Sequence, residues 1–210
     1  MDHLHNDNSL RDALRPTLEK IGKTFASTGL SPNFWTVTGF IFAIASAISY
    51  GLLGIEFGLL IGGILLLVSG FFDVVDGQVA RITGQTSKKG SYFDSMFDKI
   101  AEVAIFLGIL VSSIKVEPYL IFLAITLSLL VSYARAKADS LDVTLQGIGI
   151  GERAERLIVI AVIGISGAIL GAVLEIDSAI FMEIAVLIVV IIAAVTLIHR
   201  MIFTAKNIKE

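Results

Sequence analysis

Six long apolar segments dominate the chain after residue 30. Within them, apolar residues follow one another in unbroken runs instead of marking one face of a helix, a pattern typical of helices surrounded by lipid. The pattern predicts an all-α polytopic membrane protein with six transmembrane helices. The expected spans are Phe34–Leu53, Phe57–Arg81, Phe93–Ile114, Tyr119–Asp139, Ala154–Leu174 and Ser178–Ile202.

The first 30 residues follow a different pattern. Leucine, isoleucine and phenylalanine recur there every three or four residues, with arginines and lysines between them, at Leu10, Leu14, Leu18, Ile21 and Phe25. This spacing predicts a basic amphipathic helix that lies on an anionic membrane surface, although an ordinary helix packed on its own protein would give the same spacing. Gly29 should end this helix, and Ser31 and Pro32 should begin the next. We therefore divide the chain into a juxtamembrane segment, 1–30, and a transmembrane domain, 31–210.

Composition and charge agree with a membrane protein. Mean hydropathy is +0.86, and 17% of residues are charged, against about a quarter in ordinary soluble domains. The absence of cysteine excludes disulfides and thiolate metal sites. With six spans and a cytoplasmic N-terminus, every lysine and arginine except Lys115 falls on the cytoplasmic side, as the positive-inside rule requires. We expect a multi-pass protein of the cell membrane, with no nucleic-acid partner.

Four aspartates stand at the ends of the second and third spans. Asp73 and Asp76 are three residues apart and Asp94 and Asp98 are four apart, so each pair shares one helix face. Because the chain turns back between them, two helix ends should present two carboxylates each to a common space on the cytoplasmic side. Charges at membrane depth are expensive and usually serve a function.

These carboxylates predict a site for metal ions. They cannot all remain ionised near a bilayer without cations, and oxygen ligands favour Mg²⁺ or Mn²⁺. Two such ions could act together in phosphoryl transfer. The alternative is that the aspartates form ordinary salt bridges at the helix ends, with Arg81, Lys88, Lys89 and Lys99.

The same residues carry a resemblance to a known family. The pattern Asp73-x2-Asp76-Gly77-x2-Ala80-Arg81-x8-Gly90-x3-Asp94-x3-Asp98 resembles the complete signature of the CDP-alcohol phosphotransferases. The resemblance extends to the amphipathic N-terminal helix, to Pro32, Asn33 and Thr36, and to the six spans. It implies an integral membrane enzyme of EC 2.7.8 type, usually a homodimer. Such an enzyme moves a phosphatidyl-type group from a CDP-linked lipid to an alcohol and releases CMP.

The resemblance also implies roles for individual residues. Asp73, Asp76 and Asp94 would hold two metal ions, and Asp98 would bind one ion more weakly and act as the general base. Small residues would let the nucleotide approach the backbone, and Arg81 would contact phosphates. The residues expected to bind the CDP-linked lipid are Asn33, Thr36, Asp73, Gly77, Ala80, Arg81 and Gly90.

A group of basic residues on the same side of the membrane indicates which kind of acceptor alcohol is bound. They are Arg135, Lys137, Arg153, Arg156 and Arg200. Each alone could be an interface anchor, but five together favour an anionic acceptor such as a phosphorylated polyol, because arginine matches phosphate oxygens. "SYARAKAD" and "GERAERL" also resemble the corresponding parts of phosphatidylinositol-phosphate and archaetidylinositol-phosphate synthases. The "QGIGIG" sequence between them is interpreted as a mobile loop.

Three alternatives remain open from the sequence. Glycerol phosphate would also attract the arginines, and serine is a third acceptor for the same chemistry. A divalent-cation transporter could use intramembrane carboxylates as well. That last interpretation gives no reason for Gly77, Arg81 and Gly90, and it lacks carboxylates in the opposite half of the bundle.

Overall fold

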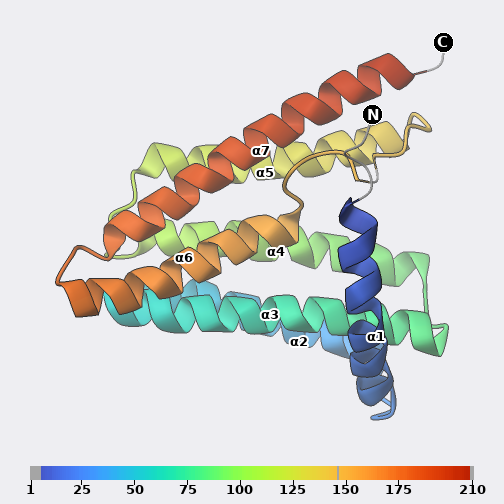
Figure 1. Ribbon diagram of the computed structural model, residues 1–210, viewed down its shortest axis with the longest axis horizontal. Helices are drawn as coiled ribbons and strands as arrows, with labels where there is room; N and C mark the ends of the chain where they lie inside the picture. The colour runs from blue at the N-terminus through green and yellow to red at the C-terminus, as the bar shows by residue number, and fades with distance from the viewer. Residues whose placement is uncertain (1–5, 146, 209–210) are drawn as a thin grey trace. The chain divides into compact units, whose positions relative to one another are not determined.

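The computed structural model describes residues 6–145 and 147–208, with side chains from residue 16 onward. The regular secondary structure of these residues is entirely α-helical. Figure 1 shows the helices in chain order. Their bounds are α1 (Asn6–Ala26), α2 (Pro32–Leu52), α3 (Ile55–Thr83), α4 (Lys88–Val111), α5 (Pro118–Asp139), α6 (Arg153–Leu174) and α7 (Ala179–Asn207). The prediction of an all-α fold is confirmed.

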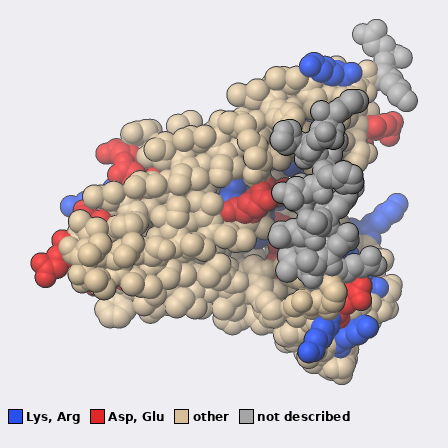
Figure 2. Space-filling model, viewed as in Figure 1, with Lys and Arg blue, Asp and Glu red and all other residues tan. Residues whose placement is uncertain are grey.

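Five of the described helices, α2, α3, α5, α6 and α7, are long and apolar enough to cross a membrane. The protein is therefore a polytopic membrane protein. Large apolar side chains stay exposed along these helices, and the face drawn in Figure 2 carries few charged residues along α6 and α7. The predicted third span, α4, is not among the five. Its first fifteen residues hold six charged side chains, which lowers its mean hydropathy.

The predicted helix boundary at residues 29–32 is confirmed. Gly29 has φ +75°, a left-handed conformation that favours glycine, and its amide hydrogen-bonds the carbonyl of Ala26, the last residue of α1. α2 begins at Pro32, and the hydroxyl of Ser31 accepts a hydrogen bond from the amide of Phe34 at 3.4 Å. The helix thus begins as the sequence predicts, because serine is favoured just before a helix and proline is favoured at its first position.

The chain forms two compact units. The first contains residues 1–41 and 68–98, and the second contains residues 42–67 and 99–210. The first unit has a core of Trp35, Val75 and Val79, against which Ile21 and Phe25 of α1 pack. The described end of the amphipathic helix therefore packs on its own protein, the alternative that its spacing left open. The side chains of Leu10 and Leu14 lie outside the described residues.

In the second unit α7 packs against both α5 and α6, as Figure 1 also shows. Glycines allow other helices of this unit to approach closely. Gly63 faces Ile165 and the carbonyl oxygen of Ala161, and a Cβ at Gly108 would collide with the carbonyl oxygen of Ala47. Backbone atoms cannot move aside as flexible side chains can, so α2 and α4 keep this distance only with glycine at position 108.

Gly108→Ala should therefore destabilise the protein although alanine is the better helix former. Overpacking a tight contact costs about 1–3 kcal/mol of unfolding free energy, or roughly 2–4 °C of melting temperature per kcal/mol. Thermal unfolding in detergent measures the shift. Gly70→Ala is the matched control, because a Cβ at Gly70 of α3 has no atom within 4 Å. An equal melting temperature for both variants would contradict the proposed close approach.

Candidate metal and nucleotide site

A short turn between α3 and α4 builds the candidate site. α3 ends at Thr83 and the chain turns at Gly84, which has φ +67°. Ser87 then caps α4, since its hydroxyl accepts a hydrogen bond from the amide of Gly90 at 2.9 Å. The end of α3 and the start of α4 both belong to the first unit. Aspartates far apart in sequence are thereby brought together.

Three of the four predicted metal ligands meet. Asp73, Asp76 and Asp94 each offer an oxygen, and these oxygens all lie within 4.8 Å of one another. Asp76 is only 7% exposed. Its Oδ2 is buried and accepts no hydrogen bond from the described residues. A group of three carboxylates that contains such an unsatisfied buried oxygen fits a hard divalent cation.

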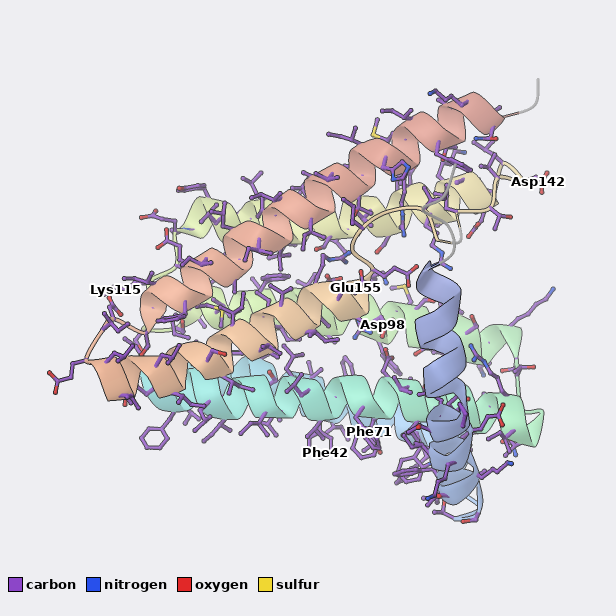
Figure 3. All side chains as sticks on the ribbon, in the orientation of Figure 1. Phe42, Phe71, Asp98, Lys115, Asp142 and Glu155 are labelled. Carbon is purple, nitrogen blue, oxygen red and sulfur yellow. The ribbon has the colours of Figure 1, made fainter. Side chains whose placement is uncertain are left out.

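Asp98 lies outside this group of three. It is half-buried on α4, one turn beyond Asp94, and is labelled in Figure 3. Its position on the same helix face is the one expected from the four-residue spacing. The weaker metal contact predicted for it, like its role as a base, stays a prediction.

A cavity of about 220 Å³ opens beside the aspartates, within the first unit. Six of the seven residues predicted to bind the CDP-linked lipid line it, and the seventh, Asp73, belongs to the carboxylate group. The lining residues among them are Asn33, Thr36, Gly77, Ala80, Arg81 and Gly90.

The cavity also has polar walls that the sequence analysis missed. Gln85, Thr86, Ser87 and Ser91 line it from the turn and from the first residues of α4. The signal was present in the sequence as a run of hydroxyl and amide side chains between two apolar helices. Residues of this kind donate hydrogen bonds to phosphate or to a sugar, so the turn is itself part of the candidate site.

The two glycines of the cavity differ in their surroundings. A Cβ at Gly90 would lie 3.0 Å from Ser87 Oγ and 3.3 Å from Asn33 Oδ1, so packing restricts that position. A Cβ at Gly77 would have no atom within 4 Å. Packing within the protein does not require glycine at 77, and the open space there belongs to the cavity.

The five basic residues predicted to bind the acceptor all lie in the second unit. Arg135 and Lys137 are exposed and Arg153 is half-buried. Arg156 and Arg200 are only 1% and 3% exposed. Their donors are engaged by the chain itself: Arg156 by Glu102 and the Gly151 carbonyl, and Arg200 by the carbonyls of Ile148 and Val131.

Comparison with known proteins identifies the family. Residues 30–205 match the CDP-alcohol phosphatidyltransferase family. The chain is 32% identical over 200 residues to the archaetidylinositol phosphate synthase of Pyrococcus horikoshii, covering 95% of this chain and 96% of that one. It belongs to the CDP-alcohol phosphatidyltransferases. The resemblance drawn from the aspartate signature is confirmed, and the protein is an enzyme of the EC 2.7.8 class.

Two further relatives are similar to this chain over most of its length. The archaetidylinositol phosphate synthase of Methanothermobacter thermautotrophicus is 32% identical over 202 residues, covering 96% of this chain and 95% of that one. The phosphatidylinositol phosphate synthase of Streptomyces avermitilis is 31% identical over 188 residues, covering 87% of this chain and 75% of that one.

Solved structures share the fold. The phosphatidylinositol phosphate synthase of Mycobacterium tuberculosis with CDP-DAG bound has a TM-score of 0.69 at 22% identity, covering 89% of this chain and 92% of that one. The same protein in complex with manganese and citrate has a TM-score of 0.70 at 22% identity, covering 90% and 88%.

Gly77→Ala tests whether the space at Gly77 is reserved for the CDP-linked substrate of this family. The variant should keep or raise the melting temperature, because alanine stabilises a helix interior by up to about 1 kcal/mol over glycine. The KM for the CDP-linked lipid should rise about tenfold, because the methyl group occupies the cavity. Gly70→Ala on the same helix should show the gain in stability with an unchanged KM. Equal KM values for all three proteins would contradict the assignment.

Proposed function

We propose that this enzyme transfers a phosphatidyl-type group, phosphatidyl or archaetidyl, from a CDP-linked lipid to a hydroxyl of inositol phosphate and releases CMP. The observation that carries the proposal is the group of Asp73, Asp76 and Asp94 beside a cavity lined by the other signature residues. The choice of inositol phosphate is supported by the names of the relatives. Glycerol phosphate is the second candidate and serine the third.

On the donor side, the cavity would hold the CDP moiety. Arg81, exposed at the end of α3, would direct its planar guanidinium to phosphate oxygens, and Gly77 would let the nucleotide reach the backbone. Asp73, Asp76 and Asp94 would hold two Mg²⁺ or Mn²⁺ ions, and a structure of the M. tuberculosis relative contains manganese. Such ions, when bound, neutralise pyrophosphate charge and polarise the phosphorus that is attacked.

The chain's own acid–base group would be Asp98. Its carboxylate would accept the proton of the attacking hydroxyl while the oxygen forms its bond to the lipid-linked phosphorus. The bond to the CMP phosphate oxygen breaks in the same displacement, and CMP leaves with that oxygen. A carboxylate a turn beyond Asp94 lies on the helix face needed for this role.

On the acceptor side, the exposed Arg135 and Lys137 and the half-buried Arg153 would bind the phosphate of the alcohol. Guanidinium groups bind phosphate through paired hydrogen bonds, whereas a neutral acceptor would gain little from them. The basic residues predicted from the sequence to bind the acceptor also include Arg156 and Arg200, whose guanidinium groups donate hydrogen bonds to the chain itself.

In the membrane, we propose that α4 also crosses the bilayer, as the third of six spans, and that the N-terminus is cytoplasmic. The aspartates at the start of α4 would then lie at the cytoplasmic side, where a water-filled cavity can solvate them. α1 would lie at the cytoplasmic surface of the cell membrane, where its exposed Lys20 and Lys23 can meet anionic lipid headgroups. We expect a homodimer.

Acceptor specificity can be measured directly. Purified protein should release CMP from CDP-diacylglycerol or its archaeal ether-lipid equivalent when inositol phosphate is added, with a higher kcat/KM than with glycerol phosphate or serine. Free inositol is the matched control, because it lacks the phosphate that the arginines would bind. Faster CMP release with glycerol phosphate would replace the acceptor assignment and leave the family unchanged.

One set of measurements should distinguish the metal ligands from the general base. Mn²⁺ should raise the melting temperature of the wild type by mass action, and this shift should disappear in Asp76→Asn. Asp98→Asn should keep most of the Mn²⁺ shift and the CDP-lipid affinity but lose about 10²–10⁴-fold in kcat. Turnover that persists in EDTA would exclude metal dependence, and a normal kcat for Asp98→Asn would place the base elsewhere.

A further inference from the structure

The end of α3 has two faces with different surroundings, both within the first unit. One face lines the cavity, with Asp76, Gly77 and Ala80. The other carries apolar side chains at three- and four-residue spacing, among them Val75 and Val79, which are both 0% exposed. Whatever covers this second face therefore also supports the helix that forms a wall of the cavity.

The last two turns of α1 cover the second face. Phe25 of α1 enters a pocket of three aromatic rings. Its ring centroid lies 4.9 Å from that of Trp35, 5.7 Å from that of Phe71 and 6.4 Å from that of Phe72, each in an edge-to-face arrangement. Phe71 is labelled in Figure 3. Such pairs are each worth about 0.5–1.5 kcal/mol beyond the area they bury, so the end of α1 is held at a defined place.

Gly22 is the point at which α1 comes closest to α3. It is buried, and a Cβ there would lie 2.9 Å from Cβ of Gln78 and 2.6 Å from Cδ1 of Ile82. Carbon atoms in ordinary contact are about 3.5–4.0 Å apart, so a methyl group would push the two helices apart by about half an ångström or more. The end of the Ile82 side chain can turn aside, but Cβ of Gln78 is fixed to the backbone. This spacing therefore requires glycine at position 22.

The close contact lies directly behind the candidate site for the CDP-linked lipid. Gln78 follows Gly77 in the chain and Ile82 follows Arg81, and both Gly77 and Arg81 line the cavity. Close-packed protein interiors transmit displacement to their neighbours. A change in the spacing of α1 and α3 would therefore also move this wall of the cavity.

Two simpler roles of α1 do not explain these contacts. A helix that only anchors the chain to the membrane surface would bury its apolar side chains in lipid, whereas Ile21 and Phe25 pack against the protein core. A lid that opened for each substrate would have to withdraw Phe25 from three aromatic rings. Neither role requires glycine at position 22.

We propose that α1 is a fixed support for the donor site and that Gly22 is a positioning residue for the CDP-linked lipid. Gly22 sets the distance between α1 and the end of α3, and Phe25 holds α1 at that distance. Both act through α3 and not by contact with the substrate. The proposal rests on the proposed function, which places the CDP moiety in the cavity.

Gly22→Ala tests the spacing. The KM for the CDP-linked lipid should rise about tenfold, because a displacement of less than 1 Å already disturbs the geometry of a bound substrate. The KM for inositol phosphate should stay within about twofold. Thr24→Ala is the matched control on the same helix, because the Thr24 side chain is exposed and donates its hydrogen bond to Lys20 of α1. An unchanged donor KM in Gly22→Ala would overturn the proposal.

A second substitution distinguishes spacing from stability. In G22A/Q78G the glycine is moved to the α3 side of the contact, so the donor KM should return to within about twofold of the wild type. Gln78→Gly alone should lower the melting temperature, because glycine in a helix interior costs up to about 1 kcal/mol, but should leave the donor KM within about twofold. A donor KM that stays raised in the double variant, or that rises in Gln78→Gly alone, overturns the proposal.

Hydrogen exchange provides a readout that needs no turnover. Amides of residues 78–82 should exchange faster in Gly22→Ala and near the wild-type rate in G22A/Q78G. Unchanged exchange in Gly22→Ala overturns the supporting role of α1. A wild-type donor KM in Gly77→Ala would instead remove the proposed donor cavity, and the exchange rates would still decide whether α1 supports α3.

Phe25→Leu provides an independent variant should Gly22→Ala fail to fold. It removes the aromatic ring from the same pocket, so it should also raise the donor KM and speed exchange at residues 78–82. Wild-type values for both in this variant would count against the proposal. A lower donor KM in either variant, the result expected of a lid that must leave the cavity, also overturns it.

Discussion

The high free energy of placing charge among apolar helices governs both parts of this protein. A carboxylate there must bind a metal ion together with other carboxylates, or pair with a buried cationic side chain. The chain uses both solutions along one helix. Asp94 joins Asp73 and Asp76 in a group that a hard metal ion can satisfy, whereas Glu102, two turns further along α4, pairs through its Oε1 with Arg156. Carboxylates of the same helix thus form a candidate metal site in one place and an internal ion pair in the other.

Arginine residues of this protein also fall into two groups, one buried and one nearer the surface. Its guanidinium carries five donors in a fixed plane, so a buried arginine can hold several backbone and side-chain oxygens at once. Arg156 and Arg200 use these donors on carbonyls of a single loop and its neighbours. Arg135 is exposed, and Arg153 is half-buried.

The surroundings of the glycines also differ from one position to another. At Gly108 and Gly151 a Cβ would collide with another part of the protein, so the residue is demanded by packing. At Gly77 the space beyond Cα is open and belongs to the cavity. Only the surroundings separate a glycine required by the fold from one compatible with a bound substrate.

The sequence by itself determined the helices, their approximate ends and the family, because apolar runs and the aspartate signature are local patterns read along one chain. It also predicted the grouping of Asp73, Asp76 and Asp94, since two helices joined by a short turn must bring their adjoining ends together. Only the tertiary structure decided that Glu102 pairs with Arg156, 54 residues away, and that Arg200 reaches the carbonyl of Val131, 69 residues away. Burial and partners of a charged side chain depend on which helices pack side by side, and apolar helices of similar composition give no local signal of that choice.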